Sequence, residues 1–310
     1  MTPEDFADAC AATIGRPFDG GLAVAVSGGP DSLALLLLAH AAYGDAIVAL
    51  TVDHGLRAAS VAEAAMVADV CAARGVPHAT LAWCGDKPSA NLQAAARDAR
   101  YALMAGHCAA QGIRWLATGH HADDQAETLL MRLARGSGAG GLSGIRRVRE
   151  LGSGVTLLRP LLGVRRAALR AVVIAAGLTA IDDPANRDPR HDRTAARTVL
   201  AATPWLDAVR LSDAAAHLAE ADAALEWTAA LAWDSRAKIG DPLAIDVADL
   251  PAEVRRRLVV RALAHFGATA RGPAINRMIE RLNDGGSATL GSIQARAGDK
   301  WTFRRARARL

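Results

Sequence analysis

The chain has 310 residues, of which 51% are hydrophobic and only 4% aromatic, and it carries a formal net charge of +4 at pH 7. This composition excludes a disordered chain, and the length is sufficient for two domains. The charge permits a polyanionic partner without requiring one. The apolar run 33–38 is much shorter than the roughly 20 residues of a membrane span, and no basic stretch followed by an apolar one begins the chain. We therefore expect a cytoplasmic protein with no membrane association.

From residue 22 to about residue 118, apolar strand-like runs alternate with segments of helical periodicity. This alternation is typical of a doubly wound α/β fold, in which helices cover both faces of a parallel sheet and ligands bind beyond the carboxyl ends of the strands. The predicted strands are 22–26, 46–52, 78–83, 115–118 and 155–158, and the predicted helices are 31–42, 60–74, 91–111, one that starts near Ala122, and 165–176.

The character of the chain changes after Trp205, where the pattern becomes helical. Helices are predicted at 212–234, 253–266 and 274–283, the last ended by Asp284-Gly285-Gly286. We therefore expect a catalytic domain over 1–210 and a smaller helical domain, for tRNA or substrate binding, over 211–310.

Four cysteines are scattered along the chain without a CxxC pair: Cys10, Cys71, Cys84 and Cys108. Their spacing suggests neither a zinc site nor an iron–sulfur site. Buried free thiols in a reducing compartment are the expected interpretation.

A glycine-rich turn joins the first predicted strand to the first predicted helix of the sheet region. Such a turn offers backbone N–H groups and the positive end of a helix dipole to a phosphate. It matches neither the Walker pattern nor the dinucleotide-binding turn, and it carries a carboxylate that could hold a divalent metal instead of a lysine. An ordinary strand-to-helix turn capped by a serine or aspartate is the alternative. The turn reads Ser27-Gly28-Gly29-Pro30-Asp31-Ser32.

Two further groups of polar residues are open to two interpretations. Asp53, His54 and Arg57, around Gly55 after the second strand, fit a nucleotide or substrate pocket but also ordinary turn chemistry. Arg97 and Arg100 share one side of the predicted helix 91–111, where they form a solvated face or contact a phosphate.

The fourth strand leads into a dense acidic segment at the start of a helix. Asp123 and Glu127 are four residues apart, as are Asp124 and Thr128, so each pair shares a helix face. Acidic residues also favour a first helical turn for electrostatic reasons alone. Together with His120 and His121 at a strand end, however, they predict a site that binds metal, orients an amine or accepts a proton.

Two loops are predicted near this site. The glycine-rich segment 135–141 is predicted to be a mobile loop, either a lid or simply flexible. The segment 182–188 is too rich in proline for a helix at its start and leads to Arg193 and Arg197. It is predicted to be an ordered loop that carries arginines toward an anionic ligand, with a plain surface loop as the alternative.

With these segments in view, the chain resembles the tRNA(Ile)-lysidine synthase family of the PP-loop ATP pyrophosphatases, whose signature is SGGxDS. The resemblance is close over 22–197 and looser beyond. It rests on SGGPDS, DHGLR, GHHADDQAET, Arg135–Gly138, Arg159-Pro160-Leu161-Leu162 and DDPANRD in this order. It implies a PP-loop ATPase domain of the adenine nucleotide alpha hydrolase-like fold.

The resemblance implies that ATP adenylates the C2 oxygen of the wobble cytidine, position 34, in the CAU anticodon of tRNA(Ile). L-lysine then displaces AMP, which gives lysidine and changes codon reading from AUG to AUA. The implied catalytic residues are Asp31, Asp123, Asp124 and Glu127, with Mg²⁺ on Asp31. The implied ATP-binding residues are Ser27, Gly28, Gly29, Pro30, Asp31, Ser32, Asp53, His54, Arg97, Gly119 and His120. The implied lysine or tRNA residues are His121, Asp123, Asp124, Glu127, Arg135, Arg193 and Arg197.

The chain departs from the family pattern where Thr194 follows Arg193, since an Arg-Asn pair is common there. At 310 residues it is also shorter than members with an additional C-terminal domain. The arginines then expected to contact tRNA are Arg255, Arg256, Arg257, Arg261 and the tail 304–309. A solvated tail is the alternative. A homodimer is possible.

Other functions compete with this one. A PP-loop tRNA thiolase would rely on paired cysteines, which the spacing does not offer. A small-molecule amidating relative and a non-catalytic nucleotide-binding module are further alternatives, and release of pyrophosphate would separate the last from an enzyme.

Overall fold

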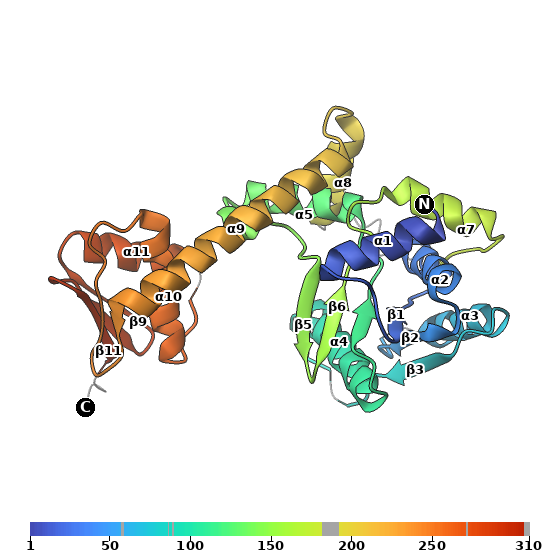
Figure 1. The fold of residues 1–310 in the computed structure, drawn as a ribbon, viewed down its shortest axis with the longest axis horizontal. Helices are drawn as coiled ribbons and strands as arrows, with labels where there is room; N and C mark the ends of the chain where they lie inside the picture. Colours follow the sequence, from blue (N-terminus) through green and yellow to red (C-terminus); the bar gives the residue numbers. More distant parts are fainter. Residues whose placement is uncertain (57–58, 86, 89, 182–191, 271, 307–310) are drawn as a thin grey trace. The chain divides into compact units, whose positions relative to one another are not determined.

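The computed structural model describes residues 1–56, 59–85, 87–88, 90–181, 192–270 and 272–306. The chain forms two compact units, Met1–Ala219 and Glu220–Leu310 (Figure 1). The boundary lies within helix α9 (Ala208–Arg236), later than the boundary at 210/211 that we expected.

Unit 1 is built on a six-stranded sheet in the order β3-β2-β1-β4-β6-β5. The first five of these strands are parallel, and β5 pairs antiparallel with β6 at the edge. Leu22 of the central strand is in register with Ile47 on one side and Trp115 on the other. The strand bounds are β1 Leu22–Ala25, β2 Ile47–Asp53, β3 His78–Ala82, β4 Trp115–Ala117, β5 Val148–Gly152 and β6 Val155–Leu158.

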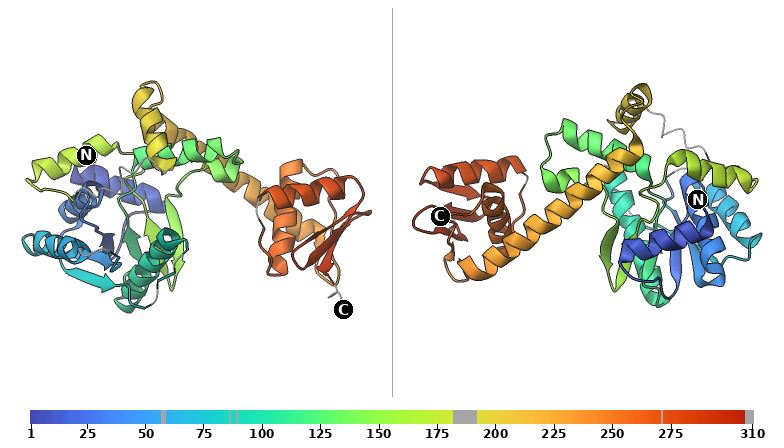
Figure 2. Two further views of the ribbon diagram at one scale, coloured as in Figure 1. Left: turned by 180° about the vertical axis from the view of Figure 1, so that it is seen from behind. Right: turned by 45° about the horizontal axis from the view of Figure 1, so that its top comes forward.

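Helices cover both faces of this sheet (Figure 2). Side chains alternate between the two faces of a strand, so Leu22 and Val24 join one core while Ala23 joins the other. The first core contains residues of α1 (Pro3–Ile14), α2 (Pro30–Tyr43), α3 (Ala59–Ala72) and α7 (Arg166–Ala175), and the second contains residues of α4 (Leu92–Ala110). The predicted doubly wound parallel sheet is therefore confirmed.

Helix α2 is buried at successive positions, including Leu33, Leu35 and Leu36, because it packs between the sheet and its neighbouring helices. This environment accounts for the apolar run seen in the sequence. Among the described residues, no helix has the length and apolar character that a membrane span requires.

One of the two predicted loops near the acidic segment contains a helix, and the other, 182–188, lies outside the described residues. After α5 (Ala122–Ala134), a short helix α6 (Ala139–Leu142) lies in the glycine-rich segment, and Arg132 Nη1 donates to the carbonyls of Gly141 and Gly144 at 2.5 and 2.8 Å. Arg193 and Arg197, expected on a loop, lie on helix α8 (Asp192–Ala202). The two arginines to which the predicted loop leads are therefore presented by a helix. Asp183 and Arg187 lie outside the described residues, as does Arg57.

Unit 2 contains the predicted helices α10 (Ala252–His265) and α11 (Gly272–Asn283), and also an antiparallel sheet that the sequence analysis did not predict. Its five strands have the order β7-β8-β11-β10-β9 and are only two to five residues long. Their inward residues, such as Ile293 and Phe303, share one core with both helices. The strand bounds are β7 Ala237–Lys238, β8 Leu243–Ile245, β9 Ser287–Leu290, β10 Ile293–Arg296 and β11 Trp301–Arg305.

All four cysteines are free thiols. Cys10, Cys71 and Cys108 are buried, and burial raises the pKa of each to about 11. Cys84 differs from the expectation because it is exposed.

Candidate active site at the carboxyl edge of the sheet

The predicted phosphate-binding turn leaves β1 and enters α2 at Gly29, the N-cap, with Pro30 in the first helical turn. Gly28 has φ +83°, and a Cβ there would lie 2.4 Å from Ile181 Cδ1, so only glycine fits. Ser32 Oγ accepts the N–H of Ser27 at 3.1 Å and donates to the carbonyl of Gly29 at 2.9 Å. The turn is therefore internally braced, as a backbone cradle for an anion requires.

Gly119, after β4, brings a second strand end against this turn. A Cβ on Gly119 would lie 2.7 Å from the carbonyl oxygen of Asp31, so a larger residue would push the two segments apart. We predicted Gly119 as an ATP-binding residue, and the observed contact gives it a packing role between α2 and the start of α5. This approach brings Asp31 and His121 together.

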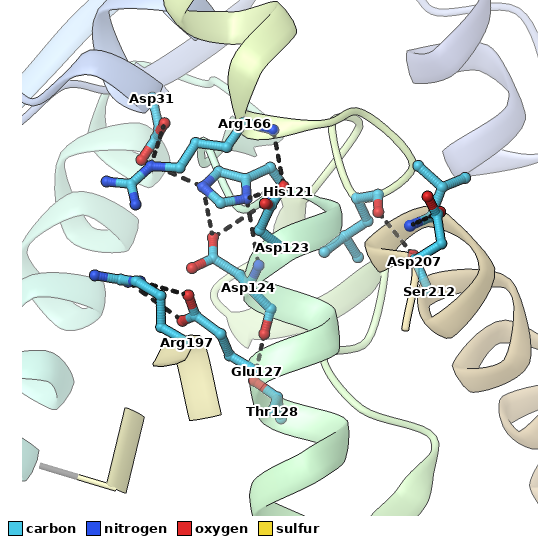
Figure 3. A network of polar contacts seen from close by, with 12 residues as sticks. Asp31, His121, Asp123, Asp124, Glu127, Thr128, Arg166, Arg197, Asp207 and Ser212 are labelled. Carbon is cyan, nitrogen blue, oxygen red and sulfur yellow. Dashed lines mark hydrogen bonds and ion pairs between the residues drawn. The ribbon is translucent and has the colours of Figure 1, made fainter. Parts of the chain in front are cut away.

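His121 is the N-cap of α5 and connects the two motifs (Figure 3). Its Nδ1 accepts the N–H of Asp124 at 3.3 Å, and its Nε2 lies 3.3 Å from Asp31 Oδ2. Both contacts fit the tautomer that carries its proton on Nε2. Burial alone would lower the pKa of His121, but the bond to Asp31 and the nearby carboxylates Asp124 and Asp123 raise it.

Asp31 is partly buried at the N-terminus of α2. One oxygen faces His121, while the other, Oδ1, is 3.9 Å from Arg166 Nε and has no hydrogen-bond partner among the described residues. Burial would raise the pKa of Asp31, but His121, Arg166 and Arg170 together lower it. Asp31 is therefore held as a carboxylate with one oxygen available to a cation.

Asp123 and Asp124 both lie near His121, at 3.7 and 3.6 Å, but they differ in their other partners. Asp123 Oδ2 accepts the backbone N–H of Arg166 at 2.8 Å and so fixes the start of α7. Asp124 Oδ2 accepts the N–H of His121, and its Oδ1 accepts from Arg193 Nη2 at 2.6 Å. Burial raises the pKa of Asp124 despite the opposing charges of His121 and Arg193.

Glu127 is buried, its side chain only 3% exposed, and is paired with two arginines of α8. Arg193 Nε and Arg197 Nε donate to its two oxygens at 2.7 and 2.8 Å. Arg135, at the end of α5, pairs with Asp192 at the start of α8. The arginines predicted to approach an anionic ligand therefore bind the acidic residues that were predicted to hold lysine.

A second cluster, of opposite charge, surrounds Tyr101 on α4. The guanidinium carbons of Arg97, Arg100 and Arg149 lie 5.2, 5.3 and 5.6 Å from its ring centroid. Arg159, which follows β6, is 3% exposed and donates to the carbonyl of Arg146 at 2.5 Å. Burial would raise the pKa of Tyr101, but Arg97, Arg100 and Arg159 lower it. We call Tyr101 and the arginines 97, 100, 149 and 159 the arginine–tyrosine cluster.

Three predicted ATP-binding residues border this cluster or lie in a nearby turn. His120 accepts from or donates to Thr118 Oγ1 at 2.9 Å, and burial followed by Arg159, Arg97 and Arg100 places its pKa well below the usual range. Burial and Arg100 also lower the pKa of His54. Asp53 Oδ1 accepts the N–H of Gly55 at 2.8 Å, which is turn chemistry.

No role was predicted from the sequence for Arg166, Arg149 or Tyr101, and Arg159 was named only within a motif. Arg159 stands directly after a predicted strand, so the strand-end rule could have identified it. The others lie inside helices or strands, where no local pattern separates them from a solvated face.

The fold and this braced turn define a nucleotide-binding protein of the doubly wound α/β class. A family model described as a PP-loop domain matches residues 5–203. The chain is 43% identical over 307 residues to a tRNA(Ile)-lysidine synthase of Zymomonas mobilis subsp. mobilis, covering 97% of this chain and 93% of the relative. It is 47% identical to a tRNA(Ile)-lysidine synthase of Novosphingobium aromaticivorans over 93% of this chain and 89% of the relative. The chain therefore belongs to the tRNA(Ile)-lysidine synthase family of PP-loop proteins.

Among solved structures, the U34-tRNA thiolase NcsA from Methanococcus maripaludis, with its [4Fe-4S] cluster, resembles the chain with a TM-score of 0.55. The likeness covers 69% of this chain and 79% of that one at 16% identity, so it reports the fold alone.

Proposed function

We propose that the chain ligates L-lysine to C2 of cytidine 34 in the CAU anticodon of tRNA(Ile), with ATP converted to AMP and pyrophosphate. The observation that carries the proposal is the contact between the phosphate-binding turn and the acidic start of α5, made through Asp31 and His121. Nucleotide activation and amine attack both require groups within one small site. The family relatives support the same reaction.

In this proposal the braced turn Ser27–Ser32 binds the phosphates of ATP through its backbone N–H groups and the N-terminus of α2. Mg²⁺ fits the site as an ion shared between protein and nucleotide, because Asp31 Oδ1 is a buried oxygen without a hydrogen bond among the described residues. No group of three or more histidine, cysteine or acidic side chains in the described part of the chain forms a ready-made metal cage. Mg²⁺ usually takes one or two carboxylates plus phosphates, and when bound it would offset charge on the departing pyrophosphate.

The acidic residues Asp123, Asp124 and Glu127 are proposed to recognise the ammonium groups of lysine. An amine attacks only after it loses a proton, and a carboxylate beside it is suited to accept that proton. The new C2–N bond forms as the C2–O bond to AMP breaks. Since Arg193 and Arg197 pair with Glu127, an ammonium group that enters this cluster must share or replace a guanidinium.

The direct test is incorporation of labelled lysine into a tRNA(Ile) transcript with a CAU anticodon, in the presence of ATP and Mg²⁺. We expect labelled tRNA with stoichiometric AMP and pyrophosphate. Sulfur transfer without lysine incorporation would overturn the proposal in favour of a thiolase, and nucleotide binding without pyrophosphate release would favour a binding module.

The matched variant for this assay is Asp31→Ala. It is expected to lower pyrophosphate release by about 10³-fold, because it removes the carboxylate proposed to hold the metal, while circular dichroism and the melting temperature change little. Full activity in this variant would contradict the metal role. That the protein is cytoplasmic and that it forms a homodimer both remain predictions.

A further inference from the structure

The arginine–tyrosine cluster has an excess of positive charge that the fold does not neutralise. Among the described residues, no carboxylate forms an ion pair with Arg97, Arg100, Arg149 or Arg159. Buried arginines in folded proteins are normally paired, since a desolvated charge is costly. The cost is tolerated here at the carboxyl edge of the sheet, where ligands of this fold class bind.

Two donors of the cluster have no hydrogen-bond partner among the described residues. They are the buried Nε atoms of Arg100 and Arg159. Arg159 is 3% exposed, so its free donor is deep in the structure. Buried Nε atoms of Arg166, Arg255 and Arg261 are unmatched in the same way, so this observation only adds to the lack of carboxylate partners in the cluster.

The cluster is graded from the surface inward. Arg97 and Arg149 are exposed, Arg100 is half-buried and Arg159 is buried. Three guanidinium groups of the cluster lie at similar distances from the ring of Tyr101. Three cations around one ring form a positive site that attracts phosphate groups. Arginine is also the residue that pairs best with phosphate oxygens.

We propose that the arginine–tyrosine cluster binds backbone phosphates of the RNA substrate, separately from the turn that binds ATP. The inference rests on the proposed function, which supplies an RNA substrate. The cluster belongs to the α4 face of the sheet, whereas the ATP-binding turn enters α2 on the opposite face. The resemblance implies ATP binding for Arg97, and His120 and His54 border the cluster, so tRNA affinity and ATP affinity are measured separately below.

The test compares two double variants of the full chain. Arg97→Gln with Arg149→Gln removes the two exposed members of the cluster. The matched control is Arg16→Gln with Arg114→Gln, which removes the same charge. These two arginines lie 5.6 and 4.8 Å from the ring of Trp115, the first residue of β4, at the amino edge of the sheet. The probes are a CAU-anticodon tRNA transcript and ATP.

The cluster variant is expected to weaken tRNA binding about tenfold and to lower the slope of log K against log salt by about 0.7 to 0.9 for each phosphate that the two arginines neutralise in the wild type. Its Kd for ATP should change less than twofold, and the control variant should match the wild type in both. Loss of ATP affinity with unchanged tRNA binding would overturn the proposal and assign the cluster to the nucleotide. Equal losses of tRNA affinity in the cluster variant and the control variant would also overturn the proposal, because they would show a general effect of charge.

The readout also separates this inference from the proposed function. It is scored by binding and salt dependence, not by turnover. If the wild type binds tRNA through the cluster but forms no lysidine, the proposed function fails while the inference stands. If lysidine forms and the cluster variant binds tRNA like the wild type, the inference fails alone.

Discussion

Arg159 in unit 1 and Arg257 in unit 2 are buried to a similar degree, 3% and 8% exposed, but their surroundings differ. Arg257 donates to three carboxylates, Asp222, Glu226 and Glu253, at 2.6, 2.9 and 3.0 Å. Arg159 donates to one backbone carbonyl and forms no ion pair among the described residues. The role of a buried arginine is therefore indicated by its hydrogen-bond and ion-pair partners and not by its burial.

This difference bears on one of our expectations about RNA contacts, which stays a prediction. Arg256, Arg257 and Arg261 on α10 were expected to contact tRNA, but each is paired within unit 2. Arg255 donates to Asn283 Oδ1 at 3.0 Å. At the C-terminus, Arg304 donates to Gln294, and Arg305 to the carbonyl of Phe266. Positions 307–310 lie outside the described residues. The arginines of α10 stabilise their unit, and the unpaired arginines of unit 1 are the better candidates for a ligand.

The largest effect that would test the comparison is expected for Arg257→Met. It removes the guanidinium that pairs with Asp222, whose side chain is 9% exposed, and breaking a buried pair costs about 3 to 5 kcal/mol. Calorimetry of the full chain should show a lower transition temperature, and hydrogen exchange should locate the loss in unit 2. Arg261→Met, from the same helix but more exposed, should cost less than about 1 kcal/mol. Equal effects would mean that burial of the pair is unimportant.

A smaller effect is expected for Glu127→Gln, which weakens the pairing of α5 with α8. Charge-assisted hydrogen bonds contribute about 1.5 to 3 kcal/mol, so residues 192–202 should exchange amide hydrogens faster while the sheet keeps its protection. Asp123→Asn is the control, because Asp123 contacts the start of α7 and not α8. Unchanged exchange in α8 would show that the two arginine pairs do not hold this helix.

The sequence was sufficient for the five parallel strands and for the location of the site, but not for the antiparallel edge strand β5. Strands such as Val155–Leu158 are short apolar runs, and the rule that parallel strands place their ligands at one edge led to Asp31, His121 and Asp124. The sheet of unit 2 was missed because its strands of two to five residues carry too little alternation to be separated from loops.

The pairing of charges could not be predicted from sequence. Arg193 and Glu127 are far apart in the chain, and whether an arginine meets a carboxylate or a ligand depends on how α8 packs against α5. The same holds for Arg97 and Tyr101, whose spacing of four on a helix predicts a shared face but says nothing about Arg149 or Arg159. Tertiary contacts decide both cases.

A modest pH effect should report the unpaired charge of unit 1. Burial, then Arg159 and the other arginines, lower the pKa of His120, so the folded chain keeps it neutral while the unfolded chain takes a proton below about pH 6.5. The unfolded state then binds more protons, and stability falls as the pH falls, by up to about 1.4 kcal/mol per pH unit for this group. His120→Gln should remove this part of the loss between pH 7 and pH 5.5 in urea titrations. His217→Gln, an exposed residue of α9, should not.

The smallest change in stability is expected for Arg159→Met. This variant tests most directly whether Arg159 and Arg257 have different roles. The substitution removes a buried charge whose loss leaves no carboxylate unpaired, and the apolar side chain fills a similar volume. The free energy of unfolding should therefore stay within about 1 kcal/mol of the wild type or rise, while affinity for the tRNA transcript falls. A destabilisation as large as that of Arg257→Met would mean that Arg159 holds the fold like its counterpart in unit 2. Near-neutral stability with weakened binding would show that unit 1 keeps this charge for a ligand.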